Sequence, residues 1–458
     1  MRLRVENFGP ISRAEIEIKP LTVLIGKNGS GKSMLAQLIY TLMDLRNHLP
    51  YLMSPITVSS QKISKINKRI KSASAEEMTP HSFVKMIGDV IVGCLTPYLS
   101  EALRRLLERN FAMELKSLVN LYSDHVRVEC FYSEHSVLEF VISKDGDLST
   151  KFNVEMMDEL IDEVLTDKRV KMFVDMILHS KERRSFISAV IMMVGERILE
   201  HALPKRPISS AFYIPAGRAG LLEGYEAVSS ALIALAPTAP LRGIFMPPLP
   251  GMASEFYSLL LRLKGKRGSF SEVAELFKDL IEGDIVFEEL EVPKGKSKMV
   301  YRFKFKDKES SIDLIHAASM VKELSPIYLV LRELVDEGDL LIIEEPESHL
   351  HPAAQIRLME IFARLVNEGL RILITTHSDI VLRELSHLLM EGLTGSKTEA
   401  SLKPDDVVVY LLKPDEKGYV AREVNILEEM PTFDEVMEQL YEKEKDLRFS
   451  LSLLKESE

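Results

Sequence analysis

Residues 21–33 read LTVLIGKNGSGKS, and this stretch decides the fold. Its first five residues form a continuous apolar run, which is typical of a buried parallel strand. The next eight match the pattern G-x-x-x-x-G-K-[ST], and an apolar segment with helical spacing, MLAQLIYTLMDL, follows them. A strand, a glycine-rich loop and a helix in this order predict a loop whose backbone amides hold phosphate groups.

The loop also indicates how a nucleotide is held. Glycines allow successive backbone N–H groups to point inward, toward phosphate oxygens. In this arrangement Lys32 brings a positive charge to the outer phosphates, and Ser33 supplies a hydroxyl ligand for Mg²⁺. The predicted contacts comprise the whole loop and the residue after it: Gly26, Lys27, Asn28, Gly29, Ser30, Gly31, Lys32, Ser33 and Met34.

A second motif supplies the acidic groups that such a site needs. Residues 339–346 read DLLIIEEP, four apolar residues followed by two glutamates. On a neighbouring strand, Glu344 would face Mg²⁺ through water, and Glu345 could orient and deprotonate the attacking water. Taken alone, the pattern also fits an apolar strand that ends in solvated glutamates, but the phosphate loop favours the catalytic interpretation.

A third motif places a histidine after another apolar strand. Residues 371–378 read RILITTHS. Because a parallel sheet gathers its ligand groups at the carboxyl edge, we expect His377 to lie beside Glu345 and the γ-phosphate. A neutral imidazole there can sense or polarise the γ-phosphate and the attacking water. A lone histidine at a strand end is more often structural, so this role depends on the other two motifs.

Strands and helices alternate along the last third of the chain. The order predicted there is a helix around 319–335, strand LLII, a helix over 353–368, strand RILITT, a helix over 379–391 and strand VVVYLL. This alternation predicts a parallel sheet with crossover helices. The alternating segments RLRVENF and AEIEIK predict two strands before the loop, and hairpins are predicted over 126–152 and 284–305.

Composition restricts the function classes. The chain has 458 residues and a net charge of −11, so the whole molecule does not attract nucleic acid by its net charge. Cys94 and Cys130 are the two cysteines, which excludes a disulfide scaffold and fits a reducing compartment. No uncharged run reaches the roughly 20 residues of a membrane span. The N-terminus, MRLRVENFGPIS, lacks the apolar core of a signal peptide. We therefore expect a cytoplasmic protein without membrane contact.

The motifs GKNGSGKS, LLIIEEPESHLHP and ITTHS, in this order, resemble the ABC-type ATPase heads of the overcoming-lysogenization-defect (OLD) family and its stand-alone relatives. SMC and break-repair ATPases are more distant kin. NFGPI before the loop and YIPAGR at 213–218 resemble further segments of that group. The resemblance covers about 1–40, 207–220 and 311–412, and it implies an ATPase that uses ATP and Mg²⁺.

The predicted fold class is α/β: a phosphate-loop, ABC-type ATPase head with a large, mostly helical insertion. The head comprises residues 1–40, a returning strand in 207–220, and 284–458, which ends in a C-terminal helix. The mostly helical insertion spans 41–206 and contains a small β segment near 126–152. A helical, proline-rich insertion spans 221–283.

The resemblance further implies a homodimer with ATP at the interface. In such heads ATP lies between one subunit's phosphate loop and the partner's signature motif, a turn of small residues that opens a helix. The matching segment, HAASMVKE at 316–323, puts Ser319 and Lys322 at the family's positions and Met320 in place of its glycine. That methionine adds bulk where the partner should approach, and Pro326 would kink the helix. An ordinary buried helix is the alternative for this segment.

Other residues in the resembling segments depart from the pattern or carry weaker implications. Glu344 stands where relatives usually have aspartate, a change that a water-mediated metal contact tolerates. Arg218 resembles a family arginine near the nucleotide. The family places the stretch with His349 and His351 in a loop that crosses between subunits; as a metal pair these histidines lack a complete ligand set.

Two functions from different classes remain open. One is an ATP-hydrolysing switch, in which closing and opening of the dimer acts on a bound nucleic acid or partner effector. Its setting would be DNA-linked genome maintenance or defence against phages and plasmids. The other is a nucleotide-binding regulatory or scaffold protein with little turnover, which Met320 and Glu344 motivate. Nuclease activity of this chain alone is not expected, because the residues after His377 show no strand-borne acidic cluster.

Three further segments have only weak signals. The lysines and arginine of Lys62–Lys71 fit a solvated helix face better than a phosphate contact. The apolar, proline-rich stretch 231–253 fits a packed loop better than a partner surface. A C-terminal amphipathic helix is predicted to begin with a capping box of Thr432 and Glu435 and to dock on the chain's own core.

Overall fold

The computed structural model describes residues 1–53, 79–134, 136–154, 158–179, 193–194, 197, 208–224, 251–292, 296–306, 308, 310–395, 398–430 and 441–448. The basic stretch Lys62–Lys71, most of the proline-rich stretch and the capping box of Thr432 and Glu435 lie outside these residues.

One large sheet organises the described part of the chain. Its eleven strands follow the order β6-β5-β4-β1-β2-β14-β13-β3-β12-β11-β7. Their bounds are β1 Arg2–Phe8, β2 Ile11–Glu17, β3 Leu21–Gly26, β4 His125–Ser133, β5 Ser136–Ser143, β6 Leu148–Val154, β7 Ala211–Ile214, β11 Leu340–Glu344, β12 Arg371–Thr376, β13 Val407–Asp415 and β14 Gly418–Glu423. The neighbours β7, β11, β12, β3 and β13 pair in parallel, as predicted for the motif-bearing strands.

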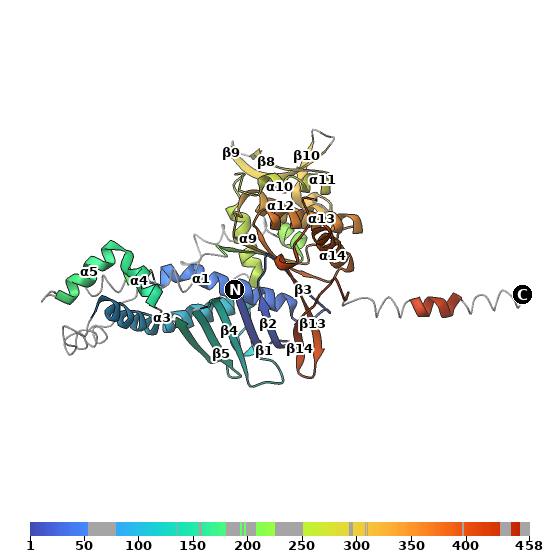
Figure 1. The fold of residues 1–458 in the computed structure, drawn as a ribbon. Coiled ribbons are helices and arrows are strands. Elements are labelled where there is room, and N and C mark those ends of the chain that lie inside the picture. Colours follow the sequence, from blue (N-terminus) through green and yellow to red (C-terminus); the bar gives the residue numbers. More distant parts are fainter. Residues whose placement is uncertain are drawn as a thin grey trace, which may run out of the picture.

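The helices cover both faces of this sheet (Figure 1). Figure 1 shows α9, α12, α13 and α14 above the central strands, and α3 with the antiparallel strands β1, β2, β4 and β5 below them. The helix bounds are α1 Lys32–Met53, α3 Pro80–Phe111, α4 Asp158–Thr166, α5 Lys168–His179, α9 Gly251–Arg262, α10 Ser271–Ala274, α11 Phe277–Leu280, α12 Ser319–Glu333, α13 Pro352–Asn367 and α14 Asp379–Thr394. Short 3-10 turns occupy Leu115–Leu118, Leu314–His316 and Pro404–Asp406.

The central strands are buried on both faces, and they divide the core in two. On β3, Leu24 joins the cluster shared with α1 and α3, whereas Val23 and Ile25 join the cluster shared with α12, α13 and α14. Strands of this kind lack a solvated face, which explains the uninterrupted apolar runs in the sequence. The predicted α/β class, with a large sheet and helical regions, is confirmed.

A second, three-stranded sheet carries the predicted hairpin over 284–305. Its order is β10-β9-β8, with β8 Gly283–Val292, β9 Lys296–Phe305 and β10 Ser311–Asp313. The hairpin predicted over 126–152 is also present, with Gly146 at a φ of 90° in the turn between β5 and β6. Glycine adopts this left-handed conformation without a side-chain penalty.

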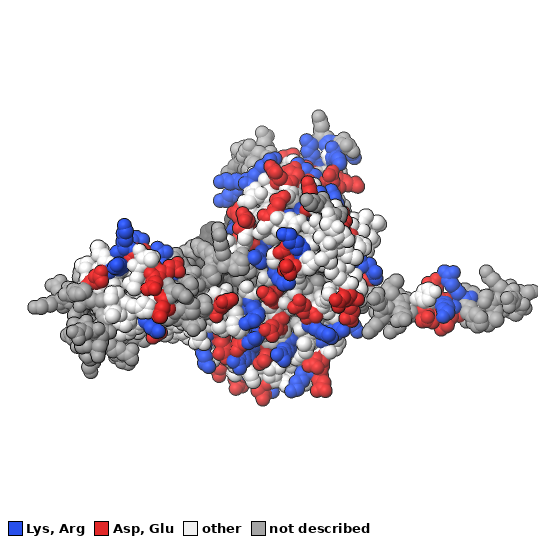
Figure 2. All heavy atoms as spheres, viewed as in Figure 1, with Lys and Arg blue, Asp and Glu red and all other residues white. Residues whose placement is uncertain are grey.

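The outer face of the antiparallel strands carries alternating charges that pair with each other. Arg4 lies 3.2 Å from Glu15, and Arg127 lies 3.1 Å from Glu139. Figure 2 shows Lys and Arg interspersed with Asp and Glu over this lower part of the molecule. A mixed, paired surface of this kind is typical of a solvated sheet face, and it has no excess of one sign with which to attract a polyanion.

Helix α3 is long and apolar enough to cross a membrane by length and composition alone. Core helices pass the same test, and α3 packs against α1 and β6. Thr79 caps its first turn, where the Thr79 hydroxyl accepts a hydrogen bond from the Ser82 amide at 3.1 Å.

Truncating a residue of β11 should destabilise the whole sheet. Ile342 is fully buried, so Ile342→Ala is expected to lower the free energy of unfolding by about 2–5 kcal/mol. The measurement is the urea midpoint followed by circular dichroism. The control is Ile356→Ala on α13, where the side chain is 38% exposed. Equal midpoints for the two variants would contradict the two-sided burial of β11.

Candidate functional site

The three motifs meet because their strands are neighbours in the sheet. β12 pairs in parallel with β3 on one side and with β11 on the other. In this register Thr376 lies opposite Ile25, and Glu344 lies opposite Thr375. The phosphate loop, the acidic pair and the histidine therefore leave the sheet at one carboxyl edge, which is where ligands bind in parallel sheets.

The phosphate loop needs glycine at its turning points. Gly26, Gly29 and Gly31 have φ values of 148°, 77° and 99°. A Cβ atom on Gly31 would lie 2.8 Å from Ile11 Cγ1, and one on Gly26 would lie 2.9 Å from the Leu412 carbonyl. The loop is therefore packed against β13 and the turn between β1 and β2, so its shape is set before any ligand arrives.

The loop residues fit a bound triphosphate. The tip, Lys27–Gly29, is exposed, whereas the Ser30 hydroxyl is buried and has no hydrogen-bond partner within the described chain. A buried hydroxyl without a partner is costly, and a phosphate oxygen would satisfy it. Backbone amides at the start of α1 add the positive end of a helix dipole. When bound, Mg²⁺ would neutralise charge on the phosphates, and Ser33 and Glu344 are the residues that would hold it.

Lys32 lies under the loop, and its charge is destabilised by burial. Its ammonium group donates to the carbonyl oxygens of Gly26 at 2.9 Å and Lys27 at 3.1 Å. Desolvation lowers the pKa of Lys32 to about 8, although Glu345 and Glu347 act in the opposite direction. This coupling indicates that the acidic motif and the loop share one electrostatic environment. Lysine desolvated in this way gains most from an incoming anion.

Glu344 is held from the side of β7. The Tyr213 hydroxyl donates to Glu344 Oε1, and the Ala216 amide donates to Glu344 Oε2 at 3.2 Å. Burial raises the pKa of Tyr213, and the Glu344 charge raises it further, so the phenol keeps its proton and remains a donor. Sequence reasoning did not assign Tyr213 a role, although it begins the YIPAGR segment of the resemblance and lies in the short strand that pairs with β11.

Glu344 can reach a metal only in company with other ligands. The described residues contain no group of three or more His, Cys, Asp or Glu side chains that could hold a metal ion. Mg²⁺ is commonly bound by one or two carboxylates together with water and substrate phosphates. With both carboxylate oxygens already accepting hydrogen bonds, Glu344 suits the water-mediated contact that the sequence predicts.

Glu345 and His377 form a close pair at the open side of the site. His377 Nε2 lies 3.5 Å from Glu345 Oε1, and the two side chains are 30% and 36% exposed. Glu345 has a φ of 43°, which is rare for a residue with a side chain and is found preferentially at functional sites. Its amide donates to the Thr375 carbonyl at 2.9 Å, which holds the turn against β12.

The surroundings of His377 favour the neutral imidazole. Its pKa is lowered by desolvation and by the Lys32 charge, while Glu345 acts in the opposite direction. A neutral imidazole beside a carboxylate can donate a hydrogen bond to a phosphate oxygen, and it can donate to or accept from water. The pair can therefore orient a water molecule and receive its proton.

Arg218 lies in the interior, behind the backbone of Glu344 and Glu345. Its side chain is fully buried, 3.0 Å from Glu323 Oε2 on α12. The guanidinium also donates to the carbonyl oxygens of Glu344 at 2.6 Å and Glu345 at 3.0 Å. Further donors bond to the carbonyl oxygens of Glu323 and Pro215, so the guanidinium braces the backbone around the acidic motif, and a contact with the nucleotide stays a prediction.

The predicted signature residues lie in the first turn of α12, and each of them has a different environment. Ser319 is exposed at the first position of the helix, which has no side-chain cap. Lys322 forms an ion pair with Glu223. Met320, expected to face a partner, is half-buried and packs against the chain's own core. α12 also continues through Pro326 to Glu333.

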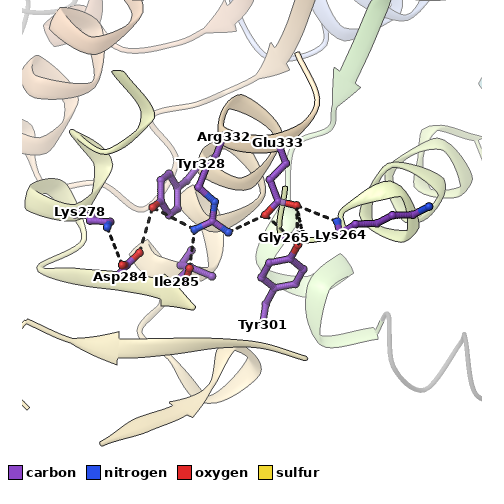
Figure 3. Close-up of polar contacts among 9 residues, drawn as sticks. All are labelled: Lys264, Gly265, Lys278, Asp284, Ile285, Tyr301, Tyr328, Arg332 and Glu333. Atoms are coloured by element: carbon purple, nitrogen blue, oxygen red, sulfur yellow. Dashed lines mark hydrogen bonds and ion pairs between the residues drawn. The ribbon is translucent and has the colours of Figure 1, made fainter. Parts of the chain in front are cut away.

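The C-terminal end of α12 is bound tightly to the three-stranded sheet (Figure 3). The buried Glu333 carboxylate accepts from the amides of Lys264 at 2.9 Å and Gly265 at 2.6 Å, and from the Tyr301 hydroxyl at 2.8 Å. Arg332 donates to the Ile285 carbonyl at 2.7 Å. Helix α12 is thereby joined to the small sheet, and to the loop at 264–265, at several points.

The two histidines of the ESHLHP stretch have backbone roles. His351 Nδ1 accepts from the Ala353 amide at 3.4 Å and caps α13, and His349 has a φ of 62° in the preceding turn. Both follow the acidic pair on the loop that the resemblance places between subunits.

Two family models match the chain. Residues 1–173, which contain the phosphate loop, match the AAA ATPase domain. Residues 321–383, which contain both acidic residues and His377, match a family described as "AAA domain, putative AbiEii toxin, Type IV TA system". Two separate segments of the chain therefore match AAA-type ATPase domains. The prediction of an ATP-binding, phosphate-loop ATPase is confirmed at this level, and membership of the OLD family stays a prediction.

Solved structures similar to the chain include SMC heads. The Smc head domain with an extended coiled coil bound to the C-terminal domain of ScpA, derived from Pyrococcus furiosus, is 14% identical, with 97% of this chain and 98% of that chain covered and a TM-score of 0.40. The SMC head domain from Thermotoga maritima is 9% identical, with 93% and 98% covered and a TM-score of 0.38. The comparison with curated proteins found no match.

The lowered pKa of Lys32 predicts a pH-dependent affinity for ATP. Because the free protein loses the Lys32 proton above a pKa of about 8, the affinity should fall about tenfold between pH 7 and pH 9. Isothermal titration with a non-hydrolysable ATP analogue measures it. Lys32→Arg is the control, since an arginine keeps its charge in this range and its weaker binding should not vary with pH. Equal pH dependence in both proteins would assign the effect to another group.

The substitution Arg218→Met distinguishes a structural role of Arg218, its buried ion pair with Glu323, from the predicted contact with the nucleotide. Removing one partner of a buried ion pair should lower the free energy of unfolding by about 3–5 kcal/mol. Chemical denaturation measures it, and Arg383→Met, an exposed arginine 3.7 Å from Asp379, should cost less than about 1 kcal/mol. A stable Arg218→Met protein that has lost only ATP affinity would restore the predicted nucleotide contact.

Proposed function

We propose that this ATPase domain hydrolyses ATP with Mg²⁺ and works as a nucleotide-driven dimerisation switch of the OLD-like kind. The observation that carries the proposal is the meeting of Lys32, Glu345 and His377 beyond the ends of three neighbouring strands, β3, β11 and β12. Glu345 acts as the general base, His377 positions water and senses the γ-phosphate, and Lys32 binds the outer phosphates.

The proposed homodimer places ATP between the phosphate loop of one copy and the α12 N-terminus of the other. Two surface features support it. The loop tip Lys27–Gly29 is exposed, and Ser319 is exposed at an uncapped helix N-terminus, whose free amides favour an anion. Met320 packs inward, so its bulk need not obstruct the partner.

The proposed setting follows the OLD-like resemblance. A cytoplasmic switch of this kind would serve DNA-linked genome maintenance or defence against phages and plasmids, with a nucleic acid or an effector protein as its client. The chain is not proposed to cleave DNA by itself.

Glu345→Gln tests the assigned base. General-base catalysis contributes typically 10²- to 10⁴-fold, so Mg²⁺-dependent ATP hydrolysis should fall at least about 100-fold while ATP affinity stays within about threefold. Light scattering of this variant should show a doubled mass with ATP and Mg²⁺ and a monomer without them.

Glu360→Gln is the matched control, since Glu360 is 31% exposed and pairs with Arg357 at 2.6 Å on α13. It should hydrolyse ATP at the wild-type rate. Wild-type turnover in Glu345→Gln would refute the base, and a constant monomeric mass would favour a regulatory nucleotide-binding protein.

A further inference from the structure

Glu347 is a third carboxylate at the site, and it faces inward. Its side chain is 8% exposed, two residues beyond Glu345. Its Oε1 accepts two hydrogen bonds, from the Thr376 hydroxyl at 2.5 Å and from the His377 amide at 3.1 Å. A carboxylate from the acidic turn thus holds the backbone of the residue whose imidazole stands 3.5 Å from Glu345.

These contacts belong to a closed ring of hydrogen bonds. The Ser378 amide donates to the Thr376 hydroxyl at 3.0 Å, and the Ser378 hydroxyl donates to Gln355 Oε1 on α13. Gln355 Nε2 donates to the Leu350 carbonyl at 3.0 Å, and the Leu350 amide donates to the Glu347 carbonyl at 3.1 Å. Glu347 supplies the carboxyl group of the ring, and it bonds both to the acidic turn and to the histidine turn.

We infer that Glu347 is a positioning residue for ATP hydrolysis, which sets the place of His377 relative to Glu345 through the Thr376 hydroxyl and the His377 amide. This inference rests on the proposed function. Buried hydrogen bonds to a charged group are among the stronger ones, and both donors here lie on the turn that carries the imidazole. Through Oε1, Glu347 holds the Thr376 hydroxyl and the His377 amide, so its effect on catalysis passes through His377.

The test compares four variants by steady-state ATP hydrolysis: Glu347→Ala, Glu347→Gln, His377→Ala and the double variant of Glu347→Ala with His377→Ala. A misplaced catalytic group costs up to about 100-fold, so Glu347→Ala should lower kcat about 10- to 100-fold with KM within about threefold. Glu347→Gln keeps an accepting oxygen and should stay within about threefold of wild type. In the His377→Ala background, Glu347→Ala should cause no further loss.

The matched control is Glu384→Ala, which removes a glutamate that is 12% exposed and lies 3.3 Å from His387 on α14. It should leave kcat unchanged. A Glu347→Ala loss of the same size in the His377→Ala background, or wild-type kcat in Glu347→Ala, would overturn the inference.

Hydrogen exchange decides the inference independently of turnover. Peptides that cover residues 376–378 should exchange faster in Glu347→Ala and at the wild-type rate in Glu347→Gln and Glu384→Ala. Unchanged exchange in Glu347→Ala would show that Glu347 does not hold this turn. If the wild-type protein hydrolyses no ATP, the proposed function fails, and the exchange result alone decides whether Glu347 positions His377.

Discussion

The parallel pairing of β3 with β12 is the interaction on which the rest of the structure depends. It joins residues 21–25 to residues 372–376, and β11 extends the same pairing by one strand. Side chains of these strands alternate between two hydrophobic clusters. A shift of register by one residue would exchange the two sets, so burial on both faces holds the register. The distance between Glu345 and His377 follows from that register.

The sequence predicted the parts of the site that depend on local patterns. The strand, glycine loop and helix over residues 21–44 carry their own signals, as do the apolar runs that precede Glu344 and His377. The order of these elements also predicts that their carboxyl ends share an edge. Local pattern therefore sufficed for the phosphate loop, the acidic pair and the histidine.

The second layer of the site could not be predicted in this way. Tyr213, Arg218 and Glu347 act through contacts with residues 29 to 131 positions away, and nothing in their own neighbourhood specifies those partners. The packing of Met320 against the core likewise depends on how α12 lies on the rest of the chain, which its own neighbourhood does not specify. Tertiary contacts between distant segments thus determine which polar residues support the catalytic ones.

The attachment of α12 to the small sheet has a mechanical consequence. Glu333 and Arg332 bind residues 264–265, β8 and β9 at one end of the helix, and Ser319 stands fourteen positions away at the other. A helix rises about 1.5 Å per residue, so the two ends of α12 are about 21 Å apart. A displacement of β8 or β9 that moves the C-terminal end of α12 would therefore be carried by the rigid helix to its exposed end at Ser319.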